Sequence, residues 1–312
     1  MHGSLSEPLQ RQLHELAVDI PAGNDKALAY AAAKFWENGF VLLLGVYDAV
    51  QMDALHAACR NVAEKHLLKC TASGIDYGPG RCTMLPEISS KQKEYLGLIR
   101  DDAHIQLLAE LHGDRWGRFS VTKFGGDFNY NAGCSYWLGT QPLHTDFTQC
   151  KPFTPWEGNS DDPPCLHAWQ PPAIASSVAC HDIGELEGPI RSMTWKQMAE
   201  WGSFTSRWVP SLAEELAFES HRPGLVATKI MMPKGSVLIR DVRVFHGGGW
   251  NQSPGSWPER VRFLPGIITC GFNFQHSSFY RPARAVPLDY YNEWQQDASV
   301  NPALIHYVVK RR

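Results

Sequence analysis

The sequence contains no apolar run long enough to cross a lipid bilayer, and it contains no cluster of lysine and arginine residues. Its 29 Lys and Arg residues and 32 Asp and Glu residues leave a formal net charge of −3, which gives no electrostatic sign of nucleic-acid binding. The N-terminal stretch MHGSLSEPLQRQLHEL lacks the basic and apolar regions of a signal peptide. These absences predict a cytoplasmic protein that binds neither a membrane nor a nucleic acid.

The spacing of the cysteines excludes further classes of protein. None of the eight cysteines forms a C-x-x-C pair, which argues against zinc ribbons and thioredoxin-type motifs. Because no export signal accompanies them, we expect reduced thiols. The 312 residues are enough for one large domain or two small ones, and we expect a single domain over 1–312.

Two periodicities divide the chain. Helical patterns occupy 25–38, 47–67 and 102–114, with a short buried strand near 40–47. From residue 119 the pattern changes to short β-rich runs punctuated by Gly, Pro or Asn. Helices first and strands later is an α+β order, and the strand spacing is typical of an antiparallel sandwich or jelly roll. We therefore expect a helical part over about 1–118, a jelly-roll core over about 119–285 and a C-terminal extension over about 286–312.

The segment 151–172 is a long connection rich in Pro and Trp. Connections of this length within a compact domain are usually functional loops or disordered. Its aromatic residues indicate that this segment is a lid that covers a substrate site.

Two His-x-Asp pairs are candidates for a metal site. His112 and Asp114 fall where a helix is expected to end at Gly113, so their side chains should diverge and play a structural part. His144 and Asp146 follow a strand-like run, in which residues two apart share a face. The second pair is therefore the better candidate.

A third ligand is expected at His246, at the end of the strand-like run SVLIRDVRVF. The glycines at 247–249 allow backbone or ligand to approach this histidine closely. With His144 and Asp146 it would form a 2-His-1-carboxylate triad, which leaves coordination positions open on a divalent metal. Arg260 and Arg262 follow on a new run and could pair with a carboxylate near the metal.

These segments resemble the phytanoyl-CoA dioxygenase family of non-haem Fe(II)/2-oxoglutarate-dependent oxygenases, and within it the branch that acts on small natural products. The similarity is carried by FWENGFVLLLGVYDAVQMDALHAAC, QPLHTDF and VACHDIGELEGPIRSM. The most specific segment is KGSVLIRDVRVFHGG followed by Asn251 and Ser253. One departure is Ile190, which stands where the family pattern has a Thr, and the later P-G-S-H is absent.

The resemblance implies a double-stranded β-helix fold, or jelly roll, with the N-terminal helices packed outside. It implies that His144, Asp146 and His246 bind Fe(II), with 2-oxoglutarate and O2 as cosubstrates. Gln141 would help to hold the metal-proximal end of 2-oxoglutarate. Arg260, or as second choice Arg262, would pair with its far carboxylate.

The resemblance also implies a reaction on a small, fairly apolar substrate, with formation of succinate and CO2. Halogenating relatives lack the carboxylate ligand, so the presence of Asp146 favours hydroxylation, desaturation or rearrangement. We expect substrate contacts at Arg81, Trp156 and Trp169. The oligomeric state stays open, with a homodimer among the alternatives.

Two other readings use the same residues. A zinc-dependent hydrolase could use the His/Asp/His set, but it would need a general base over a metal-bound water and leaves the downstream arginine unexplained. A non-catalytic jelly-roll binding protein is the third reading, because a fold does not determine a function.

Overall fold

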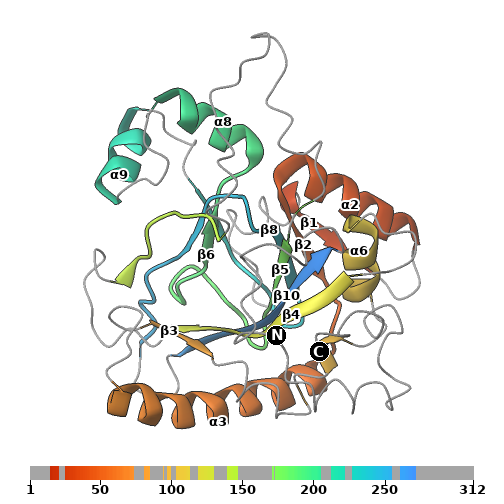
Figure 1. Cartoon of the computed structure of the whole chain (residues 1–312), viewed down its shortest axis with the longest axis vertical. Coiled ribbons are helices and arrows are strands. Elements are labelled where there is room, and N and C mark those ends of the chain that lie inside the picture. The colour runs from red at the N-terminus through yellow and green to blue at the C-terminus, as the bar shows by residue number, and fades with distance from the viewer. Residues whose placement is uncertain are drawn as a thin grey trace, which may run out of the picture.

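The computed structural model has a sheet-rich core with helices around it (Figure 1). The structure describes residues 15–20, 25–73, 81–84, 94, 97–99, 103–112, 119–129, 139–146, 171, 173–204, 212–221, 227–254 and 261–271. The helices are α2 (Asp25–Asn38), α3 (Ala49–Ser73), η1 (Gly97–Ile99), α6 (Ala103–Leu111), α8 (Trp195–Phe204) and α9 (Leu212–His221). The strands are β1 (Ala17–Asp19), β2 (Phe40–Leu44), β3 (Arg81–Met84), β4 (Phe119–Asn129), β5 (Ala173–Val178), β6 (Ile190–Ser192), β7 (Thr228–Ile230), β8 (Val237–Asp241), β9 (His246–Gly248) and β10 (Arg262–Gly271).

The strands form two sheets. The larger has seven strands in the order β1-β2-β8-β5-β10-β4-β3, and the smaller has three in the order β7-β6-β9. β1 pairs with β2 in parallel, and the other strand pairs are antiparallel. After β5 the chain passes between the sheets repeatedly, because β6, β7 and β9 lie in the small sheet and β8 and β10 in the large one. Because β8 ends at Asp241 and β9 begins at His246, the end of β8 and the start of β9 lie close together.

The helix α2 ends where the sequence predicts. Its buried face is formed by Leu28, Ala31, Ala32 and Phe35. Gly39 follows the last helical residue with a φ of +83°, and its N–H donates to the Phe35 carbonyl at 2.7 Å. A left-handed conformation at this position closes a helix and favours glycine. The chain then enters β2 directly.

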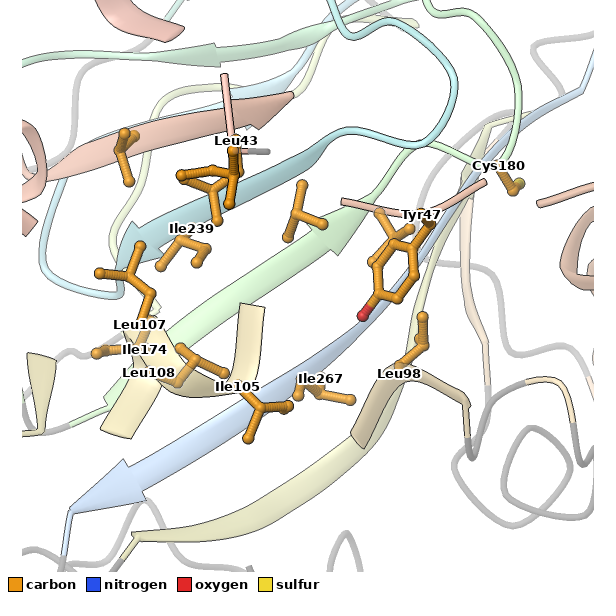
Figure 2. Packing of buried hydrophobic residues seen from close by; sticks show 14 of the residues in the cluster. Leu43, Tyr47, Leu98, Ile105, Leu107, Leu108, Ile174, Cys180, Ile239 and Ile267 are labelled. Carbon is orange, nitrogen blue, oxygen red and sulfur yellow. The ribbon is translucent and has the colours of Figure 1, made fainter. Parts of the chain in front are cut away.

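One face of the large sheet packs against helices. Four adjacent strands contribute Leu43, Ile239, Ile174 and Ile267, and α6 contributes Ile105 among others (Figure 2). The opposite face of the same strands carries Phe40, Leu42, Leu238 and Leu264, which pack with residues near the small sheet such as Ile230 and Met232. Successive side chains of a strand alternate between faces, so Arg240 of β8 shares the second face with Leu238. That face also carries the candidate site.

The expected order of helices first and strands later is wrong in two places. The strands β1 and β3 lie within the part expected to be helical, where β2 confirms the short strand expected near 40–47, and α8 and α9 lie between β6 and β7. Figure 1 shows α8 and α9 at the opposite end of the molecule from α3. The start of α8 is fixed by a capping box, in which the Thr194 N–H donates to Gln197 Oε1 at 2.7 Å and the Gln197 N–H to Thr194 Oγ1 at 3.2 Å.

Two further expectations concern the chain near the site. The expected strand over 134–140 is described only at 139–140, and no strand is present there. The expected lid over 151–172 lies outside the described residues except for 171. Within the described helices, none is both long and apolar enough to span a membrane.

Candidate metal site

The two segments that carry the candidate ligands are joined by backbone hydrogen bonds. His144 and His246 form an isolated antiparallel bridge, and the Asp146 N–H donates to the Val242 carbonyl at 3.1 Å. His246 is the first residue of β9, whereas 142–146 forms no longer strand of its own. Backbone hydrogen bonds to Val242 and His246 thus hold the segment in place.

This pairing brings His144, Asp146 and His246 together. One ligand atom from each lies within 4.8 Å of the other two. The Nε2 atom of His246 lies 3.4 Å from Asp146 Oδ2, and Nε2 of His144 lies 3.8 Å from Asp146 Oδ1. The three residues could therefore hold one metal ion, as the sequence predicts.

Hydrogen bonds at the other ring nitrogens orient both imidazoles. The Nδ1 atom of His144 lies 2.9 Å from the Pro142 carbonyl oxygen, and Nδ1 of His246 lies 3.1 Å from the Val244 carbonyl oxygen. A carbonyl oxygen only accepts, so a proton on each Nδ1 satisfies it. At His246 the Val244 carbonyl shares Nδ1 with Arg240, whose Nη1 lies 2.8 Å from it. Where Nδ1 carries the proton, Nε2 presents the lone pair that can bind a metal, which is the usual arrangement of metal-binding histidines.

The charges of the site also suit a cation. Burial would raise the pKa of Asp146, but His246, in its protonated form, and the permanently charged Arg240 outweigh it and hold that pKa well below its usual range. Burial and then Arg240 lower the pKa of His246 to about 4. At neutral pH the carboxylate is therefore ionised and His246 is neutral, and the permanent charge of Arg240 is what keeps Asp146 ionised.

One side of the site is open. The side chains of His144 and Asp146 are each 29% exposed, whereas that of His246 is 10% exposed. A ligand can therefore reach a bound metal from the side of His144 and Asp146.

Gln141 lies beside the triad. Its Oε1 atom accepts a hydrogen bond from the Gly248 N–H at 3.1 Å, and its Nε2 atom lies 3.4 Å from His144 Nε2. Its backbone N–H donates to the Gly248 carbonyl at 2.9 Å. A Cβ atom added to Gly247 would lie 2.6 Å from the Gln141 carbonyl oxygen. The close approach expected at the glycines is therefore one between two backbones.

Three residues that support the site were not predicted from the sequence. Arg240 donates to Asp146 Oδ2 at 3.0 Å. Arg191 donates to Glu215 Oε2 at 2.5 Å and to the Gln141 carbonyl at 2.6 Å, while Glu215 Oε1 accepts from the Leu143 N–H at 2.9 Å. Arg240 could have been noticed as a charged residue inside an apolar strand. Glu215 carries no such signal, because its helix α9 was not expected.

The other predicted site residues are placed less fully. Arg262 is 1% exposed at the start of β10, and its Nη1 donates to the Gly188 carbonyl at 2.6 Å. Arg260, Trp156 and Trp169 lie outside the described residues, and Arg81 is described only as the first residue of β3. The cosubstrate and substrate roles of these residues stay predictions.

The rival His-x-Asp pair is represented by His112, which follows the last residue of α6. His112 is 3% exposed, and its Nε2 lies 2.8 Å from Thr269 Oγ1. Its surroundings are those of a buried structural residue, as expected. Gly113 and Asp114 lie outside the described residues.

Comparison with known proteins identifies a shared fold. No protein-family model matches this chain, and no curated protein matches it. The resemblance to the phytanoyl-CoA dioxygenase family therefore stays a prediction. Among solved structures, the non-heme alpha ketoglutarate dependent epimerase SnoN from nogalamycin biosynthesis is similar, with a TM-score of 0.50 and 14% sequence identity. The match covers 80% of this chain and 84% of that chain.

A second structure of the same neighbour gives the same result. SnoN in complex with Fe3+, alpha ketoglutarate and nogalamycin RO matches with a TM-score of 0.50 and 16% identity, over 80% of this chain and 85% of that chain. At this identity the likeness establishes the fold. The chain therefore has the mixed, sheet-rich fold of SnoN, with a His/Asp/His set that could hold a metal.

Proposed function

We propose that this protein is an Fe(II)- and 2-oxoglutarate-dependent oxidoreductase that acts on a C–H bond of a small, fairly apolar molecule. The observation that carries the proposal is the convergence of His144, Asp146 and His246, whose ligand atoms lie within 4.8 Å of one another. The reaction proposed is hydroxylation, desaturation or a related C–H oxidation. We also propose that the two sheets form a double-stranded β-helix.

The donor set fits a first-row divalent metal. It offers one ionised carboxylate and two imidazoles whose Nδ1 atoms face carbonyl oxygens. Two nitrogens and one oxygen leave three positions of an octahedral ion open, as in non-haem iron oxygenases. Iron bound there would supply, with 2-oxoglutarate and O2, the oxidising power that breaks a C–H bond while 2-oxoglutarate becomes succinate and CO2.

The chain's own residues would bind and orient the cosubstrate. The Nε2 amide of Gln141 faces the metal side of His144 at 3.4 Å and is placed to donate to an oxygen of 2-oxoglutarate. Arg260 stays the first choice for the far carboxylate and Arg262 the second. A planar guanidinium matches a carboxylate with two parallel hydrogen bonds, so replacement of the correct arginine by Lys should raise the KM for 2-oxoglutarate.

The description of SnoN adds a further kind of product to those that should be tested for. SnoN is described as an alpha ketoglutarate dependent epimerase, and one of its structures contains nogalamycin RO. A change of configuration leaves the mass of a substrate unchanged. A search for products of this protein should therefore include stereoisomers as well as gain of oxygen and loss of two hydrogens.

The substrate contacts proposed are Trp156 and Trp169 of the segment 151–172, together with Arg81. The segment begins shortly after Asp146 in the sequence, and its aromatic side chains would cover an apolar ligand and exclude water. Acyl-CoA is disfavoured because the sequence has no basic patch suited to the CoA phosphates.

The experiment is a turnover assay with Fe(II), 2-oxoglutarate and O2 against terpenoid, polyketide and alkaloid candidates, with succinate and product measured by mass spectrometry and chiral chromatography. Wild-type protein should form succinate, and His144→Ala and His246→Ala should not. His221→Ala is the matched control, because this exposed histidine on α9 lies outside the triad. Equal succinate formation in all four proteins would overturn the proposal.

The metal identified in the purified protein tests the rival readings. Tight zinc without any effect of 2-oxoglutarate would favour the hydrolase, and failure to bind any divalent metal would favour a binding protein. Iron binding that 2-oxoglutarate strengthens would support the oxygenase.

A further inference from the structure

Arg240 occupies an unusual place for a charged residue. It lies in β8, a strand flanked on both sides by β2 and β5, and its side chain is 8% exposed. Its strand neighbours Val237 and Ile239 belong to the helix-covered core, so Arg240 projects from the other face. Burying a guanidinium in an apolar strand is costly unless an anion compensates it.

The compensating anion is the candidate metal ligand itself. Nη2 of Arg240 donates to Asp146 Oδ2 at 3.0 Å, and Nη1 lies 2.8 Å from Nδ1 of His246. The Val244 carbonyl oxygen lies 3.1 Å from the same Nδ1 atom. If this Nδ1 carries a proton and donates it to Val244, it cannot also accept a hydrogen bond from Arg240. Asp146 is then the acceptor of Arg240.

Other buried arginines near the site are compensated differently. Arg191 pairs with Glu215, and Arg243 pairs with Asp241 at 2.6 Å. Neither carboxylate belongs to the triad. Arg240 therefore adds a positive charge directly to the ligand set, where a metal ion will add two more.

We propose that Arg240 is a positioning residue that makes the site weak for a divalent metal alone and strong for the metal together with a dianionic cosubstrate. The inference rests on the proposed function, because 2-oxoglutarate is that dianion. The charges of Arg240 and the ionised Asp146 cancel each other. A divalent metal and doubly charged 2-oxoglutarate also cancel, so these four groups together carry no net charge, whereas the metal alone leaves two uncompensated positive charges.

The ion pair also limits how Asp146 can bind. Chelation of the metal through both carboxylate oxygens would bring Oδ2, and with it the guanidinium, toward the cation. Repulsion between the two cations favours a single metal-bound oxygen, Oδ1, while Oδ2 stays with Arg240. Single-oxygen binding keeps an additional metal position open for the cosubstrate.

The test uses Co(II) as a spectroscopic probe of the full-length protein, with 2-oxoglutarate added in a second titration. Arg240→Gln should raise the affinity for Co(II) alone about tenfold and lower the affinity of the Co(II)-loaded protein for 2-oxoglutarate about tenfold. Arg240→Lys retains the charge and should keep both affinities near those of the wild type. The visible absorption bands of Co(II) report the coordination number, so a role in holding Asp146 to one oxygen predicts a changed spectrum in Arg240→Gln.

A merely structural role predicts a different result. If Arg240 only holds Asp146 in place, Arg240→Gln lowers both affinities together, and that outcome overturns the proposal. Arg243→Gln is the matched control, since it removes a buried arginine that pairs with Asp241, and it should leave both affinities unchanged after its folding is verified by a thermal melt. If wild-type protein binds Co(II) but not 2-oxoglutarate, the proposed function fails, whereas the Co(II) arm still decides the effect of the Arg240 charge on the metal.

Discussion

His144 and His246 are bound to each other through their backbones. The N–H of each donates to the carbonyl of the other at 2.9 Å, and the centroids of the two imidazole rings lie 4.4 Å apart. Two residues far apart in the sequence are thereby fixed as neighbours before any metal is bound. The entropic cost of assembling the ligands is met during folding, which should strengthen metal binding.

A preformed site should stabilise the fold when it binds a metal. A ligand that binds only the folded state raises the free energy of unfolding by about 2.7 kcal/mol at a concentration 100 times its Kd. We expect Co(II) to raise the Tm of the wild type and to have no such effect on His144→Ala, His246→Ala or Asp146→Asn. His221→Ala should respond like the wild type. An undiminished shift in the triad variants would place the metal elsewhere.

The backbone contact at Gly247 offers a test of the same preorganisation. A Cβ atom at this position would lie 2.6 Å from the Gln141 carbonyl oxygen and 3.1 Å from that of Pro142. Gly247→Ala should force the two ligand segments apart, with a loss of about 1–3 kcal/mol in stability and about 10-fold or more in metal affinity. Gly97→Ala is the matched control, because nothing lies within 4 Å of its added Cβ. Denaturant melts and Co(II) titrations of both variants decide between these outcomes.

The sequence predicted the residues of the candidate site more completely than it predicted the order of helices and strands around them. Local rules were sufficient for α2, since an alanine-rich run followed by Asn38 and Gly39 specifies both the helix and its end. The triad was predictable because its ligands stand in short motifs with informative spacing. The end of α2 and each short motif of the triad consist of residues that are close together in the sequence, although the two motifs of the triad are far apart.

The missed features depend on contacts between distant segments. The carboxylate partner of Arg240 is Asp146, 94 positions earlier in the chain, and the pair forms only when β8 lies beside the segment that carries Asp146. The strand β1 has three residues and exists through its pairing with β2. The helix α8 was not predicted although Thr194 and Gln197 form a recognisable capping box, because it is a short helix between β-rich runs.

The buried ion pair of Arg191 and Glu215 should be important for both stability and the site. Glu215→Ala leaves the buried Arg191 without its carboxylate and removes the acceptor of the Leu143 N–H. Breaking a buried pair in this way costs about 3–5 kcal/mol. We also expect weaker metal binding, since Arg191 and Glu215 together hold the backbone of the segment that leads into His144.

Two comparisons define the control for this prediction. Lys229 and Glu185 form a pair whose side chains are 52% and 67% exposed, so Glu185→Ala should change the stability by less than about 1 kcal/mol. Glu215→Gln retains an acceptor for Leu143 and should preserve more of the metal affinity than Glu215→Ala. Similar losses in Glu185→Ala and Glu215→Ala, measured in urea, would contradict the role given to the buried pair.

Buried neutral histidines should make the protein sensitive to acid. Burial lowers the pKa values of His104 and His112 to about 3 each, compared with 6.5 in the unfolded chain. Since the unfolded state binds protons more readily, their stabilising contribution is complete above pH 6.5 and is lost progressively as the pH falls toward 3. Between pH 7.5 and 4.5 each histidine should cost roughly 2–3 kcal/mol of unfolding free energy.

A pair of variants isolates the contribution of His104. His104→Leu removes the titrating ring and should reduce the slope of stability against pH by about 0.9 kcal/mol per pH unit averaged over this window, rising to about 1.4 kcal/mol per unit near pH 5. Tyr47→Phe removes the hydroxyl group that lies 3.0 Å from His104 Nδ1 but keeps the ring, so it should lower the stability while leaving the slope unchanged. Urea denaturation of the three proteins at pH 7.5, 6.0 and 4.5 measures both quantities. An unchanged slope in His104→Leu would show that His104 does not cause the loss of stability in acid. The substitution removes the ring, and with it any proton that His104 takes up on unfolding.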